Sequence, residues 1–507
     1  KAVPWATGAK ARTRVDVYAP AMGHGEAVEK VTRKRAETMA SRLIEADHWR
    51  KGMSPGYPLG LNIVDNTSMY TSWEDMAIVL AGPRSGKSLC YAIPAVLSAP
   101  GPCLATSNKG DILDVTAPIR RLDHPNGRIW TFDPERIADP NRKSAPWVWD
   151  LIASVQSIAD AKRIADCWRY ASGQPQTGGD DFFPGTAAQQ LADYLFAAHL
   201  GGRSVSDVFR WCSNERDTSP ADILSEYPRY AGIASRVSSV IALTPETRSG
   251  VFGSLQTMVA FLADPEIIDW IDPHRDTEGN IDERRGLFDP YEFATSEDTL
   301  YLLSAQGRPS TALTASLTAV VAFTAFQRAQ SEFTDNNRRL PVPLCCVLDE
   351  AANICRWPEL ADVYSYFGSA GIPIMTIWQN PDQGRAAFGE TNFGSLFNNA
   401  NITVYLGGIK DAKFLGEISQ LVGQREIVRG SVNIDGTGRR SVNNSIQKEN
   451  ILDVSDLTEW PVGRALLLAS QSRAQIVKTL PWTGNRQWAD ALAQAKAKAR
   501  DEQRKAA

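Results

Sequence analysis

Short apolar runs alternate with helical patterns along much of this chain. Runs of about four to eight apolar residues are typical of buried strands, and their alternation with helices indicates a parallel sheet covered by helices. We expect such strands at 75–80, 102–107, 127–133, 298–304, 344–348, 371–378, 402–407 and 464–469. The pattern therefore predicts the α/β class with a parallel-dominated sheet.

The strand signals stop between residues 157 and 270. Apolar residues recur there at helical spacing, in the segments 158–171, 186–200, 205–212, 231–241 and 249–263. The length is enough for a separate folding unit. We therefore predict an all-α domain at 157–270, inserted into an α/β domain formed by residues 58–156 and 271–485. A further long helix is expected at 311–333.

The two ends of the chain and one late segment are polar. Residues 1–57 are predicted to form an N-terminal arm with a charged helix at 25–48, and residues 486–507 a solvated, frayed helical tail. The segment 431–450, rich in Gly, Asn and Ser, predicts a flexible hairpin or a disordered loop. Because the chain begins at Lys1 rather than at methionine, we expect a membrane anchor to have been removed ahead of it.

The amino-acid composition limits how the chain could bind nucleic acid, metal ions or a membrane. With 54 Lys and Arg against 58 Asp and Glu the net charge is −4, so nucleic acid can be bound only through local positive strips. The seven cysteines and five histidines form neither a disulfide framework nor a zinc-binding spacing, which is typical of a reducing compartment. No run of the sequence approaches the ~20 apolar residues of a membrane span, and the apolar segment 312–326 is expected in the core.

The strongest chemical signal is the segment 81–88, Ala-Gly-Pro-Arg-Ser-Gly-Lys-Ser. It follows an expected strand and precedes an expected helix at 89–97, which is the arrangement of a phosphate-binding P-loop. Lys87 is expected to reach the β- and γ-phosphates, and the Ser88 hydroxyl to hold Mg²⁺. A glycine-rich turn that fits the pattern by chance is disfavoured by the flanking strand and helix. The residues predicted to bind ATP are Gly82, Pro83, Arg84, Ser85, Gly86, Lys87, Ser88 and Leu89.

Two later strands end in residues suited to phosphate chemistry. Asp349 and Glu350 follow the strand at 344–348; Asp349 is expected to bind the Mg²⁺ shell and Glu350 to orient or deprotonate the attacking water. Gln379 follows the strand at 371–378, and its amide is expected to sense the γ-phosphate or that water. Ordinary polar strand ends are the alternative in both cases, and the P-loop in the same chain favours the catalytic interpretation.

Taken in order, these motifs resemble the conjugative coupling proteins of type IV secretion systems, the TraG/TraD group. The resemblance covers most of residues 58–482, and the shared order of motifs is more specific than any one of them. Besides the P-loop, Asp349-Glu350 and Gln379, it includes Phe132-Asp133-Pro134, Phe182-Phe183-Pro184-Gly185, the segment 452–460 and Ser107-Asn108-Lys109-Gly110-Asp111, where family members show a sequence like Asp-Pro-Lys-Gly-Glu.

The resemblance implies a RecA-like P-loop ATPase of the FtsK/HerA superfamily that uses ATP and Mg²⁺. It implies a homo-hexamer at the cytoplasmic face of the inner membrane, with a soluble fragment being monomeric, that pumps relaxase-linked single-stranded DNA to the secretion channel. Relaxase, DNA and channel proteins would be its partners, and the helical insertion would recruit substrate. A translocase of double-stranded DNA, a protein-secretion ATPase and a non-hydrolysing adaptor are the alternatives. The intact Lys87, Ser88, Asp349 and Glu350 disfavour the adaptor.

Two features depart from the family pattern. The membrane-spanning N-terminus is missing, and Gly368-Ser369-Ala370-Gly371 stands where many members have an arginine. An arginine finger acting across a subunit interface must then come from elsewhere. Arg248, Arg308 and Arg385 lie near expected loop ends, and Arg385, which follows the Gln379 strand, is the favoured candidate. An ordinary surface arginine is the alternative for each.

Overall fold

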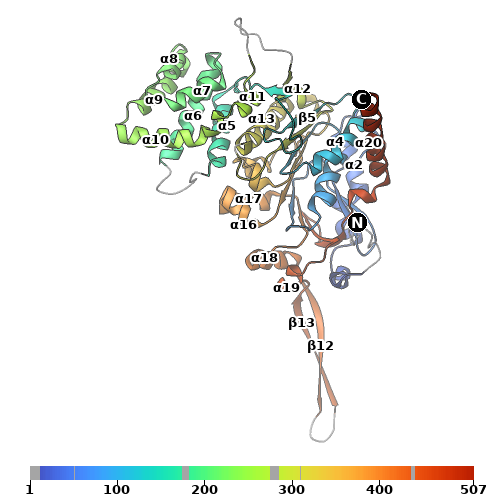
Figure 1. Cartoon of the computed structure of the whole chain (residues 1–507). Helices are drawn as coiled ribbons and strands as arrows, with labels where there is room; N and C mark the ends of the chain where they lie inside the picture. Colours follow the sequence, from blue (N-terminus) through green and yellow to red (C-terminus); the bar gives the residue numbers. More distant parts are fainter. Residues whose placement is uncertain are drawn as a thin grey trace.

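An eleven-stranded sheet forms the centre of the molecule (Figure 1), in the order β2-β1-β15-β14-β11-β3-β10-β9-β4-β8-β5. The computed structural model describes residues 12–50, 52–173, 182–274, 285–308, 310–434 and 440–506. The strands are β1 (Pro58–Asn62), β2 (Ser68–Tyr70), β3 (Ala77–Leu80), β4 (Cys103–Ser107), β5 (Ile129–Phe132), β8 (Thr299–Leu303), β9 (Cys345–Leu348), β10 (Ile374–Trp378), β11 (Ile402–Tyr405), β14 (Arg464–Ala469) and β15 (Gln475–Lys478).

The strands from β11 to β5 in this order run parallel to one another. Every residue of β3, β4, β8, β9, β10 and β11 is buried, as continuous apolar strands with helices on both faces should be. The expected α/β fold with a parallel-dominated sheet is confirmed. The strands β14, β15, β1 and β2 extend the sheet in antiparallel fashion. Sequence inspection missed β1, β2 and β15. Pro58 and Gly60 interrupt the apolar pattern of β1, β2 is a three-residue strand, and β15 has polar residues at both ends.

One face of the sheet is covered by α3 (Ile93–Ser98), α4 (Asp111–Asp123), α20 (Arg486–Ala506) and the N-terminal segment with α2 (Arg33–Leu43). The expected helix at 25–48 is wrong as one element. A 3-10 segment, Gly25–Val31, precedes α2, because Thr32 is extended and its hydroxyl caps α2 by accepting from the Arg35 amide at 3.3 Å. The tail is also not free: α20 packs on α4 and buries Leu492.

The other face carries the long helix α13 (Ser310–Ser331) and most of the remaining helices. These are α12 (Pro290–Phe293), α14 (Ala351–Ile354), α15 (Leu360–Val363), α16 (Pro381–Phe388), α17 (Glu390–Asn399), α18 (Ala412–Val422) and α19 (Val454–Thr458). Among the described residues, α13 is the one single helix long and apolar enough to cross a membrane, and 78% of its apolar window is buried. Its burial makes it a core helix, as expected for the segment 312–326.

The helices expected between residues 157 and 270 are present: α5 (Ile158–Ala171), α6 (Phe182–Leu200), α7 (Val205–Ser213), α8 (Ser219–Ser225), α9 (Ala231–Ile241), α10 (Pro245–Val259) and α11 (Pro265–Ile271). They gather beside the sheet (Figure 1). α5 packs on α13, where the Trp168 indole donates to the Ser316 hydroxyl at 3.0 Å, so the group shares a continuous apolar core with the α/β body. Its assignment as a separate domain stays a prediction.

Two small sheets complete the fold. β6 (Trp147–Trp149) pairs with β7 (Gly286–Phe288), and β12 (Gln424–Ile434) pairs with β13 (Arg440–Asn450) over eleven residues each. The β12–β13 ribbon stands clear of the body (Figure 1). A hairpin was expected from residue 431, but pairing begins at Gln424; residues 435–439 of the expected loop lie outside the described part of the chain.

Candidate nucleotide site

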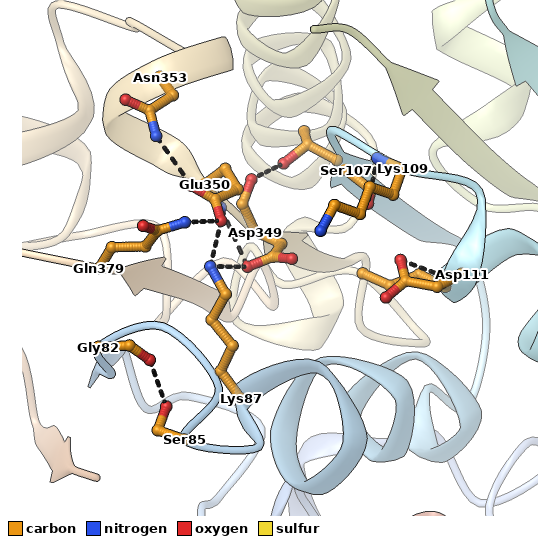
Figure 2. A network of polar contacts seen from close by, with 12 residues as sticks. Gly82, Ser85, Lys87, Ser107, Lys109, Asp111, Asp349, Glu350, Asn353 and Gln379 are labelled. Carbon is orange, nitrogen blue, oxygen red and sulfur yellow. Dashed lines mark hydrogen bonds and ion pairs between the residues drawn. The ribbon is translucent and has the colours of Figure 1, made fainter. Parts of the chain in front are cut away.

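The strand order brings the predicted site residues together. β10 lies between β3 and β9, and all three run parallel, so their carboxyl ends meet at one edge of the sheet. The P-loop follows β3, Gln379 follows β10, and Asp349 with Glu350 follows β9. Figure 2 shows these side chains pointing toward one another from three neighbouring strands.

The P-loop backbone has the shape of a phosphate cradle. Gly86 and Arg84 have positive φ, 90° and 62°, and the Ser85 hydroxyl donates to the Gly82 carbonyl at 2.7 Å. A π-helical turn, Ser88–Ala92, then runs directly into α3, and the Cys90 amide donates to the Gly86 carbonyl at 2.9 Å. Backbone N–H groups of such a turn and of the helix start bind anions.

A second loop supports the P-loop from behind. The Gly82 amide donates to the Gly407 carbonyl at 2.9 Å, just after β11. A methyl group on Gly82 would lie 2.4 Å from the Gly408 carbonyl oxygen. Only glycine allows this close approach of the two backbones. The segment 402–407 was expected only as a strand, so this support was missed.

Lys87 forms ion pairs with both carboxylates. Its Nζ lies 3.5 Å from Asp349 Oδ1 and contacts Glu350 Oε1. The Lys87 side chain is 14% exposed, and the two carboxylate side chains are 3% exposed. In so little water the charges interact strongly, and the ammonium offsets the repulsion between the two acids.

Glu350 accepts hydrogen bonds on both of its oxygens (Figure 2). Oε1 accepts from Lys87 and from the Gln379 amide, and Oε2 accepts from Asn353 Nδ2 at 2.8 Å. The Glu350 backbone is left-handed, with φ 57°, which costs of order 1 kcal/mol or more for a residue other than glycine. Sequence inspection missed Asn353; its position one turn after Glu350 in a strand-to-helix junction is the signal that could have found it.

The two acids differ in their pKa values. Burial raises the pKa of Asp349 to about 6, with Lys87 acting against it and the charges of Glu350 and Asp111 adding to it. Burial acts in the same direction on Glu350, but hydrogen bonds and charge from Lys87 outweigh it and lower the pKa of that carboxyl. Asp111 belongs to the 107–111 motif at the start of α4, so this motif adds negative charge beside Asp349.

These residues fit a nucleotide with Mg²⁺. The P-loop turn has its two positive-φ residues at Arg84 and Gly86, Lys87 is a cation at its end, and Ser88 and Asp349 offer oxygen atoms. Mg²⁺ in such sites takes few protein ligands and is completed by phosphates and water. The part of the chain that the structure describes contains no cluster of three or more His, Cys, Asp or Glu suited to a metal.

The three candidate arginines have different surroundings. Arg385, in α16, donates to Asp411 at 2.8 Å and to Asp382 at 2.9 Å. Arg248 donates to Glu215 and to two backbone carbonyls within the helical region. Arg308 is exposed in the loop between β8 and α13, at the same sheet edge as the P-loop. The finger role stays a prediction for all three.

The fold and this edge define the class of the chain: it has the RecA-like P-loop fold. Residues 343–462 match the family described as "TraM recognition site of TraD and TraG", a stretch that contains Asp349, Glu350 and Gln379. No curated protein sequence matches the chain.

Solved structures agree with this class. The chain is similar to the unbound bacterial conjugative coupling protein TrwBdeltaN70, with 14% identity, a TM-score of 0.58 and coverage of 91% of this chain and 96% of that one. It is also similar to TrwB in complex with ADP and Mg²⁺ (14% identity, TM-score 0.56) and with the non-hydrolysable ATP analogue ADPNP (14%, 0.57), each covering 90% of this chain and 96% of that one. The family match confirms the expected resemblance to the TraG/TraD group over residues 343–462, and the solved structures show that the fold is shared.

Proposed function

We propose that this chain is an ATPase of the conjugative coupling type, and that it drives DNA toward a secretion channel. One observation carries the ATPase part: Lys87, Glu350 and Gln379 make direct contact at the carboxyl ends of adjacent strands, beside Asp349. A cation, a carboxylate base and an amide donor beside a phosphate cradle are what phosphoryl transfer to water requires.

Each side chain has a separate task in this proposal. Lys87 exchanges its carboxylate contacts for the β- and γ-phosphates. Ser88 and Asp349 would hold the Mg²⁺ shell, and the ion would supply positive charge that offsets the charge of the phosphates. Glu350, whose pKa Lys87 lowers in the nucleotide-free protein, starts as a carboxylate and accepts the proton of the attacking water. Gln379 then donates to that water or to the γ-phosphate.

The transport part rests on the similarities. TrwB is described as a conjugative coupling protein, and the matched family as a recognition site for TraM. We therefore propose relaxase-linked single-stranded DNA as cargo, a relaxosome protein and channel proteins as partners, and substrate recruitment by the helical region 157–270. A membrane-held hexamer suits a chain of net charge −4, because six copies can line a narrow pore with the few Lys and Arg that face it.

Hydrolysis measured with single-stranded DNA, with double-stranded DNA and without DNA tests the proposal. Stimulation by single strands is expected. Stimulation by double strands alone would favour a translocase of the FtsK/HerA type, and no response to either would favour a protein-secretion ATPase. Lys87→Ala should abolish turnover, whereas Glu350→Gln should bind ATP normally and stop hydrolysis. Normal turnover by Glu350→Gln would refute the assigned base.

Arg385 remains our proposed finger, and it can be tested across subunits. Arg385→Ala and Lys87→Ala chains are each expected to be inactive. Mixed assemblies should regain part of the activity, because an intact Arg385 would then face an intact P-loop in some interfaces. The Asp382 and Asp411 contacts would have to open for this. Absence of recovery, with mixing verified, would direct the search to Arg308.

A further inference from the structure

Three side chains donate hydrogen bonds to the Glu350 carboxylate. They differ in whether that hydrogen bond can persist while a nucleotide is bound and hydrolysed. Lys87 and Gln379 both donate to Oε1. Asn353 alone among the described residues donates to Oε2, at 2.8 Å. Its side chain is buried, with the residue 8% exposed.

Two of these donors have other tasks when a nucleotide is bound. Lys87 belongs to the P-loop, and its charge is needed at the phosphates. Gln379 stands at the end of β10, where its amide is to contact water or the γ-phosphate. Both of these contacts with Oε1 are therefore temporary, and the carboxylate would then depend on Oε2 for its orientation.

Asn353 is fixed to the same junction as the base. The backbone N–H of Asn353 donates to the backbone carbonyl of Glu350 at 2.8 Å, and the backbone N–H of Ile354 donates to the same carbonyl at 3.1 Å. The Glu350 amide donates to Asp349 Oδ1 at 3.1 Å. Backbone and side chain thus form one closed turn in which Asn353 moves with Glu350, while Lys87 and Gln379 belong to other strands.

We infer that Asn353 is the positioning residue of the proposed ATPase: its amide holds Glu350 Oε2 so that Oε1 faces the attacking water throughout the cycle. The inference rests on the proposed function. It assigns Asn353 no contact with nucleotide; it acts through Glu350. A carboxylate free to rotate about its last bonds would spend much of its time misaligned, and misplacement of a catalytic group is costly to rate.

Asn353→Ala should therefore lower kcat by about 10- to 100-fold, the range given by losing a hydrogen bond to a charged group. KM for ATP and the affinity for a fluorescent, non-hydrolysable ATP analogue should stay at the wild-type values. Asn353→Leu nearly keeps the side-chain shape and removes the donor without adding a charge beside Glu350, so it should show the same loss even where the alanine variant folds poorly. Asn399→Ala is the matched control: its side chain donates to the Ala361 carbonyl, away from this site, and its kcat should be unchanged.

A second measurement separates positioning from structure. In the Glu350→Gln background only a slow residual rate of hydrolysis is left, which a long single-turnover time course measures. Adding Asn353→Ala should not lower this residual rate, because Asn353 acts only through the carboxylate that glutamine replaces. Wild-type kcat in both Asn353 variants would overturn the inference. A loss of nucleotide affinity or a further, additive loss of rate would also overturn it. A wild-type chain without ATPase activity would instead refute the proposed function on which the inference rests.

Discussion

Asp349→Asn should stabilise the folded protein while it removes a residue the chemistry needs. The Asp349 side chain is 3% exposed, and its pKa stands at about 6 against an ordinary value of 3.8. Each pKa unit corresponds to about 1.4 kcal/mol. Keeping this carboxylate ionised therefore costs about 3 kcal/mol at pH 7, a cost that asparagine avoids with the same shape.

The gain in the free energy of unfolding that Asp349→Asn produces should depend on pH, with a sign that follows from the raised pKa of Asp349. At pH 7 the folded protein holds Asp349 ionised against burial, so the gain from Asn should be largest, up to about 3 kcal/mol. Below about pH 3 the carboxyl is protonated in the folded and unfolded states alike, so the two proteins should unfold together. The gain should grow between these limits, because there the folded wild type binds more protons than the unfolded chain.

Urea unfolding followed by tryptophan fluorescence, with EDTA and no nucleotide, measures this at pH 4, 5, 6 and 7. Glu350→Gln is the matched control with the opposite sign. The pKa of Glu350 is lowered, so its ionised form stabilises the fold above its ordinary pKa, and the glutamine variant should be less stable at pH 7. If Asp349→Asn were destabilising at pH 7, Lys87 would outweigh burial at this carboxylate and the reasoning would be refuted.

Three further substitutions should lower stability for different reasons. Gly82→Ala should cost about 1–3 kcal/mol through overpacking and weaken ATP-analogue binding, because its methyl group would lie 2.4 Å from the Gly408 carbonyl oxygen. Asp16→Ala should cost about 3 kcal/mol by urea unfolding, since it leaves the nearly buried Arg464 guanidinium without its bidentate partner at 2.7 and 2.8 Å. Arg120→Met should cost about 3 kcal/mol in the same assay, because this buried arginine donates to the carbonyls of Ala99 and Gly101, which would lose their donors.

The parallel strands could be predicted because their local signal and their environment agree. β3, β9 and β10 are buried on both faces, so continuous apolar runs mark them. Long-range pairing has no such signal. The N-terminal segment shows this: Asp16, in the 3-10 segment Arg14–Ala21, pairs with Arg464 of β14 across 448 positions. The charge pattern that predicted an N-terminal arm could not report that contact.

The sequence motifs of the site could be predicted, but the contacts between their residues could not. The P-loop, the acids and Gln379 are local motifs at strand ends. That Gln379 contacts Glu350 follows from β10 lying between β3 and β9, which only the fold decides. Asn353 and the Gly407–Gly408 support carry no motif of their own, since their roles come from contact with Glu350 and Gly82.

The functional interpretation does not depend on similarity alone, because two left-handed residues and a buried acid lie together at this edge. Arg84 and Glu350 both have left-handed backbones without being glycine, and Asp349 is buried against its preference for water. Sequences generally agree with their fold at every level, and conflicts that persist are expected at functional sites. A P-loop kept only as a scaffold would not need a buried acid pair, a strained glutamate and a lysine held between them. The arrangement is what a site needs when a phosphate is to replace the carboxylates around Lys87.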